Sequence, residues 1–65
     1  MNVSRKLFNK LQEIHCDKDF VIGVMSNAKN VEDRQAILDF IENESTFSVE
    51  DIILLSLHLH NERLK

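Results

Sequence analysis

The stretch TFSVEDIILLSLHLHN, from Thr46 to Asn61, decides the fold because two different periods fit it. In steps of two it is a β-strand that carries His58 and His60 side by side on one face. At about 100° per residue it is a helix on which the same two imidazoles lie about 200° apart. The strand would present a His-x-His pair, whereas the helix is so apolar that it would need cover on most of its sides.

Signals at the start of this stretch favour the helix. Ser48 is a good N-cap residue, and Asp51 completes an acidic variant of the capping box. Phe47 and Ile52 occupy the two positions of a hydrophobic staple. Leucine, which occupies four positions between 54 and 59, forms helices well and is only an average strand former. We therefore predict a helix over 48–63.

Two other segments have clear helical periodicity. The first has apolar residues at spacings of four, four and three, with Phe8 beside them: Val3, Leu7, Leu11 and Ile14. In the second, Asn30 is the N-cap and one helical face carries Ala36, Ile37, Phe40 and Ile41. These patterns predict helices over 3–15 and 31–44.

Residues 18–28 have mixed signals. Asp17 is a plausible N-cap, and Asp19 in the first turn suits the positive end of a helix dipole. In contrast, the run FVIGV is rich in β-branched residues, and Gly23 weakens a helix by about 1 kcal/mol relative to alanine. We predict a helix here, while the composition leaves a strand open.

Together these segments predict one all-α domain over 1–65, a compact bundle of three to four short helices. The last two helices are expected to form an antiparallel hairpin. The alternative is an α/β fold with strands at 20–25 and 52–60, joined by a right-handed crossover through the helix at 31–44. A two-stranded parallel sheet is a poor independent structure, which favours the all-α fold.

The size and net charge of the chain limit the classes of function that it can have. A 65-residue domain buries about 60% of its unfolded surface, and a single cysteine rules out an intramolecular disulfide. Self-association or partner binding is therefore the natural additional source of stability. The net charge of −3 disfavours a general nucleic-acid binder, although the basic cluster of Arg5, Lys6 and Lys10 offers possible phosphate contacts.

The sequence contains no residue spacing that is typical of a catalytic or metal-binding site. Histidines on a helix need a separation of four to share an ion, which His58 and His60 lack. A mixed site of His15, Cys16 and a C-terminal histidine would require the first and last helices to pack together. We predict a non-enzymatic protein with no catalytic residue, cofactor or metal, and no small-molecule substrate.

The N-terminus lacks the apolar core of a secretory signal, and the longest apolar run, 52–55, is too short to span a bilayer. A soluble, cytoplasmic protein that does not bind membranes is expected.

The last helix carries the strongest functional hint. Apolar residues cover more than half of its circumference, and Leu54 lies outside that arc. Such a helix is either central to the core of the domain or shared between that core and a second molecule. For the second case we expect a partner or oligomer interface formed by Ile53, Leu54, Leu57, His60 and Leu64. The predicted function is a small protein–protein interaction or regulatory module that binds another protein or itself, as a homo-oligomer. The alternative is a nucleic-acid-associated regulator that uses the basic first helix.

Overall fold

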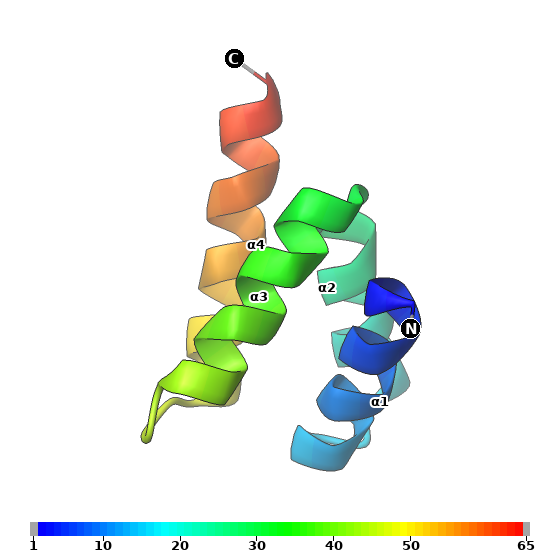
Figure 1. Cartoon of the computed structure of the whole chain (residues 1–65), viewed down its shortest axis with the longest axis vertical. Coiled ribbons are helices and arrows are strands. Elements are labelled where there is room, and N and C mark those ends of the chain that lie inside the picture. Colours follow the sequence, from blue (N-terminus) through cyan, green and yellow to red (C-terminus); the bar gives the residue numbers. More distant parts are fainter. Residues whose placement is uncertain (1, 65) are drawn as a thin grey trace.

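The computed structural model describes residues 2–64, and this part of the chain contains four helices and no strand. They are α1 (Val3–Ile14), α2 (Lys18–Asn27), α3 (Val31–Asn43) and α4 (Val49–Leu64) (Figure 1). The all-α prediction is confirmed, and the α/β alternative is wrong. The ambiguous segment at 18–28 is the helix α2, so its β-branched residues and Gly23 do not prevent helix formation when the helix packs against others.

The first three helices begin with the same device. A side-chain oxygen of the N-cap residue accepts a hydrogen bond from a backbone N–H in the first turn, at 2.9 Å in each case. The pairs are Asn2 with Ser4, Asp17 with Asp19, and Asn30 with Asp33. The predicted caps at Asp17 and Asn30 are confirmed, and the Asn2 cap adds a third.

The start of α4 has the predicted capping box. The backbone N–H of Ser48 donates to Asp51 Oδ2 at 2.9 Å, and the backbone N–H of Asp51 donates to Ser48 Oγ at 3.2 Å. Phe47 is half-buried against the core, and Ile52 is fully buried. The opening stretch is therefore a capped helix, and the strand that would pair the two histidines is absent.

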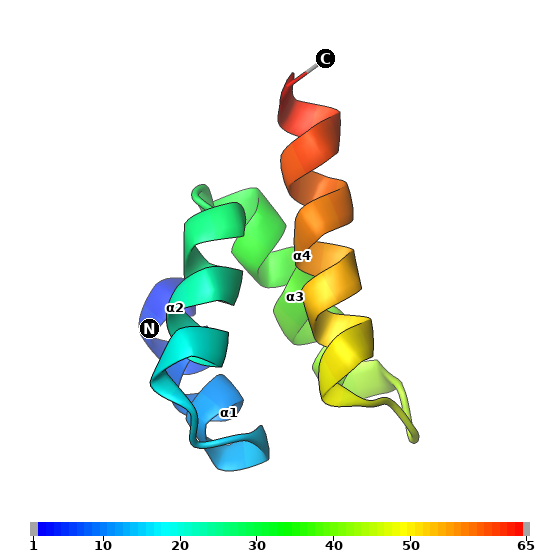
Figure 2. The ribbon, with the colours of Figure 1, turned by 180° about the vertical axis from the view of Figure 1, so that it is seen from behind.

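The helices form two hairpins that pack against each other. α1 and α2 run antiparallel, as do α3 and α4, which separate from a shared loop at 44–48 (Figures 1 and 2). Across the two hairpins, α1 packs mainly on α3, and α2 packs mainly on α4. The predicted antiparallel pairing of the last two helices is confirmed.

The core lies between the hairpins and is shared unequally. α4 is the longest helix but contributes only Ile52 and Ser56 as buried residues. The other three helices and the residue after α2 contribute the rest of the buried apolar side chains: Leu7, Leu11, Phe20, Val21, Val24, Ala28, Ile37, Leu38 and Ile41. Val49, Ile53, Leu55 and Leu59 of α4 are partly buried against this core, whereas three of its leucines are exposed: Leu54, Leu57 and Leu64.

Arg34, on α3, joins three helices. Its Nε donates to the carbonyl of Ala28 at 2.6 Å, and its Nη2 donates to the carbonyl of Met25 at 3.1 Å. Its Nη1 donates to Ser4 Oγ on α1 at 2.7 Å. The last turn of α2 has no basic residue of its own, so Arg34 supplies a cation and donors to carbonyls at the end of that helix.

Arg63 fastens the end of α4 to the start of α3. Its Nε donates to Asp33 Oδ2, and its Nη2 donates to Glu32 Oε2, both at 3.2 Å. The same Nη2 lies 3.2 Å from Asn30 Oδ1, the cap of α3. The hydrogen bonds that Arg63 donates to Asp33, and then to Glu32, raise the pKa of Arg63 above its ordinary value. This cluster closes the open end of the second hairpin.

Two of the turns between the helices begin with extended backbone. The residues that end α1 and α3, His15 and Glu44, both have β-region angles. Over residues 2–64 there is no positive φ angle and no cis peptide bond. The single glycine, Gly23, lies inside α2, where a Cβ would meet no atom within 4 Å. None of the turns therefore depends on glycine.

Candidate interaction surfaces

An apolar stripe runs along the outer side of α4. Leu54, Leu57 and Leu64 are 63%, 41% and 72% exposed, and Ile53 and His60 are half-buried. All five predicted interface residues therefore reach the surface of the described chain. Ile53 also packs against the core, as do Leu55 and Leu59 on the opposite flank of the helix.

Four of these residues fall on one line. Ile53, Leu57, His60 and Leu64 are separated by four, three and four residues. At about 100° per residue they lie within about 60° of one another on the helix surface. Alternating spacings of three and four are typical of helices that pack side by side. We call these four residues the α4 seam. Leu54 lies beside it.

The ends of α4 differ in charge. The first turn contains Glu50 and Asp51, and the last turn contains Arg63. Such a distribution complements the dipole of the helix. Arg63 already pairs with Asp33 and Glu32 of α3, so the acidic first turn is the end whose charge can influence the orientation of a second α4 helix.

The histidines and the cysteine do not converge. His58 is exposed on α4, while His15 and Cys16 lie in the turn between α1 and α2, near the opposite end of the molecule from the C-terminal end of α4 (Figure 1). His15 packs its ring edge against Phe20, with centroids 5.5 Å apart, and its Nε2 lies 3.5 Å from Asp17 Oδ2. No group of three or more potential metal ligands occurs among the described residues.

The basic cluster of α1 lies around a shallow hollow of about 510 Å³ that Arg5, Lys6 and Lys10 share with Asn2, Asn9 and Glu13. Lys6 Nζ lies 3.9 Å from a carboxylate oxygen of Glu42, and Lys10 Nζ lies 3.8 Å from one of Glu13. Two of the three cations thus already have a carboxylate partner, which weakens the case for a phosphate site.

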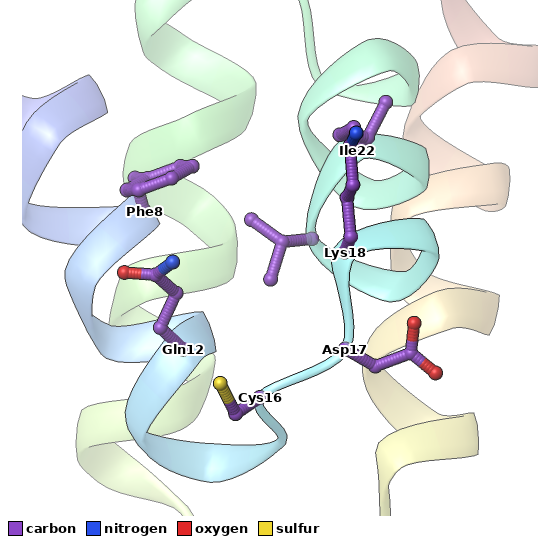
Figure 3. A pocket seen from close by; sticks show the side chains of 7 residues that line it. Phe8, Gln12, Cys16, Asp17, Lys18 and Ile22 are labelled. Carbon is purple, nitrogen blue, oxygen red and sulfur yellow. The ribbon is translucent and has the colours of Figure 1, made fainter.

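A second apolar surface, which the sequence did not lead us to expect, is the groove between α1 and α2 (Figure 3). Phe8 on α1 and Ile22 on α2 are 39% and 49% exposed. Two adjoining hollows of about 430 and 410 Å³ share both side chains. Periodicity placed Phe8 beside the buried face of its helix. The one sequence signal for this exposed surface was the run of three apolar residues at 20–22. Three consecutive residues of a helix cannot all face one core, so one of them must be exposed.

None of the four helices, over residues 2–64, has the length and apolarity that crossing a membrane requires. No protein family, curated protein or solved structure matches this chain. The function of the protein must therefore be inferred from its own surfaces, of which the α4 seam and the α1–α2 groove both expose large apolar side chains.

Proposed function

We propose that this protein is a small non-enzymatic interaction module that associates with a second copy of itself through the α4 seam. The observation that carries the proposal is the exposure of three leucines, Leu54, Leu57 and Leu64, on the longest helix of a small domain. Single exposed apolar residues are common, but a row of them on one helix marks a contact surface. The same surface would also serve a regulatory module whose partner is another protein.

The spacing of the seam supports pairing with itself. The sequence of separations, four, three and four, is the same in both directions along the helix. In an antiparallel pair, Ile53 would therefore face Leu64 of the second copy, and Leu57 would face His60 of the second copy. A two-fold symmetric contact needs such self-complementarity.

The charges at the start of α4 support the same antiparallel orientation. In this orientation the acidic first turn, with Glu50 and Asp51, would lie near the C-terminal end of the other α4 and away from the other acidic first turn. The two helix dipoles would also oppose each other, which is favourable. A parallel pair would bring the two acidic turns together.

The expected affinity is modest. A contact made by one helix face from each copy buries less than the roughly 1,200 Å² at which standard interfaces begin. Interfaces smaller than this limit are typical of weak and transient complexes. We expect a dissociation constant in roughly the high-micromolar range.

Sedimentation equilibrium up to about 1 mM protein tests the proposal. The wild-type chain should show a monomer–dimer equilibrium, and Leu57→Glu should remove it, because a charge at the centre of the contact cannot be desolvated cheaply. Ile22→Glu is the matched control, since it adds the same charge at an exposed apolar site on α2 and should leave the dimer intact. A strictly monomeric wild-type chain would refute self-association.

A further inference from the structure

The groove between α1 and α2 has an apolar floor that is open to solvent. Phe8 projects from α1, and Ile22 lies across the gap on α2, with Gln12 and Cys16 completing the α1 side (Figure 3). Val21 lines the groove from below, and Met25 continues it towards the end of α2. The two adjoining hollows form one elongated depression, because Phe8 and Ile22 border both.

The lining of this groove is positively charged in a protein whose net charge is −3. Its cations are Lys18, Lys29 and Arg34, and its one carboxylate is Asp17. Asp17 accepts the hydrogen bond that caps α2 and lies beside His15, so it is already engaged.

The cations themselves lack carboxylate partners. Arg34 bonds only to carbonyls and a hydroxyl. Among residues 2–64, neither Lys18 nor Lys29 forms an ion pair.

The two lysines mark the ends of the groove. They are eleven positions apart in the sequence, at the start of α2 and just beyond its end. At about 1.5 Å per residue this is roughly 16 Å, the length of three helical turns. A helix bound in a groove places apolar anchors at i, i+3 or i+4, and i+7, a stretch that fits within this length.

We propose that this groove binds an amphipathic helix of another protein, one that carries carboxylates at both ends of an apolar stripe. The apolar anchors would cover Phe8 and Ile22, and the terminal carboxylates would pair with Lys18 and Lys29. This interaction uses a surface separate from the α4 seam, so it does not depend on self-association.

Selection from a display library of random 16-residue peptides against the full chain tests this inference. The enriched peptides should share apolar residues at helical spacing with Asp or Glu on both sides. Ile22→Glu should reduce their affinity by at least roughly tenfold, because Ile22 borders both hollows and the new charge repels the carboxylates. Leu54→Glu on α4 is the matched control and should leave the affinity unchanged.

A charge-reversal variant tests whether the carboxylates of the bound helix contribute to binding, or whether any apolar peptide would bind equally well. The double variant Lys18→Glu with Lys29→Glu should weaken the enriched peptides by about tenfold at low salt and by less at high salt. It should strengthen synthetic versions in which lysine replaces the terminal carboxylates. Enriched peptides without acidic ends, or affinities that ignore the charge reversal, would overturn the proposal.

A second copy of this chain is the competing occupant. A synthetic peptide of residues 48–64 carries acidic residues and leucines of its own and serves as the probe. The proposal expects it not to displace the selected peptides from the groove. Displacement that Ile22→Glu abolishes would assign the groove to self-association and overturn the proposal. If no peptide is enriched over the Ile22→Glu variant, the groove is not a helix-binding site.

Discussion

Two arginines close this bundle, and they do so by different physics. Arg34 is half-buried where α1, α2 and α3 meet, and its partners are two backbone carbonyls and a serine hydroxyl. Arg63 is exposed at the end of α4, and its partners are mainly the carboxylates of Asp33 and Glu32. Arg34 donates hydrogen bonds to carbonyls and a hydroxyl that are partly buried, whereas Arg63 pairs with one exposed carboxylate, Glu32, and one buried carboxylate, Asp33.

The difference decides how replaceable each residue is. If Arg34 is removed, carbonyls at the end of α2 lose their hydrogen-bond donors in a partly buried place. The folded state is then destabilised by the desolvation free energy of those carbonyls. The exposed carboxylate of Glu32 regains water when the cation leaves, and salt screens its attraction to Arg63, whereas the buried carboxylate of Asp33 regains little water. The two arginines should therefore differ in both the size and the salt dependence of their contributions.

Arg34→Met should have the largest effect on stability. It removes three hydrogen bonds while keeping much of the apolar stem, and we expect a loss of about 2–3 kcal/mol in the free energy of unfolding. Urea unfolding followed by circular dichroism measures it. Arg34→Lys should recover less than half, because an ammonium group cannot reproduce the fork of the guanidinium. A loss below about 0.5 kcal/mol for Arg34→Met would show that water replaces these bonds.

Arg63→Met should destabilise the protein less than Arg34→Met, because the exposed Glu32 regains water, although the buried carboxylate of Asp33 loses its cation. The loss should be smaller at about 1 M than at about 0.02 M NaCl, because Arg63 and Glu32 are exposed to salt, whereas the Arg34→Met loss should change little. Urea is the right denaturant because it adds no salt. Equal salt dependence for the two variants would remove the distinction between the two junctions.

The pH dependence of the Arg63 junction follows from the raised pKa of that arginine. A group with a raised folded-state pKa contributes its full stability below the unfolded-state pKa and loses it only as the pH rises through the folded-state value. For arginine both values lie far above neutral. The difference between wild type and Arg63→Met should therefore stay constant from pH 7 to about pH 10. A decline in that range would mean that another group titrates at this junction.

Gly23→Ala should have the smallest effect, and it should be favourable. Gly23 lies in the middle of α2 with open space where a Cβ would be, so alanine should add about 0.5–1 kcal/mol through helix propensity alone. Thermal unfolding should show a higher midpoint. The gain should add to either arginine variant, because the methyl group would contact neither junction. It also provides a background in which Arg34→Met is easier to study.

The sequence predicted the parts of the fold that local chemistry controls. Ser48 and Asp51 start α4 through groups three residues apart, and Asn30 caps α3 in the same local way. Residues 18–28 remained ambiguous because the preference of β-branched residues depends on packing against other elements. The choice between helix and strand was thus made by tertiary contacts.

The surfaces were predictable only in part. The α4 seam followed from an excess of apolar residues, although periodicity did not reveal that Ser56 is one of the two buried residues of that helix. Ser56 fits there because its hydroxyl donates to the carbonyl of Ile53 and accepts from Asn27 on α2. The α1–α2 groove depends on how far apart two helices lie at Phe8 and Ile22, which no single-helix pattern contains.

The absence of any positive φ angle over residues 2–64 affects how substitutions in this protein should be interpreted. In most small domains some positions tolerate only glycine, because the backbone there is strained for any other residue. This chain has no such position among its described residues. In a complete mutational scan, few substitutions other than those to proline should therefore destabilise the protein through backbone strain. The sensitive positions should be those whose side chains make contacts. Some positions should accept every substitution without loss of stability and yet lose activity in a binding selection. These positions would mark the interaction surfaces directly.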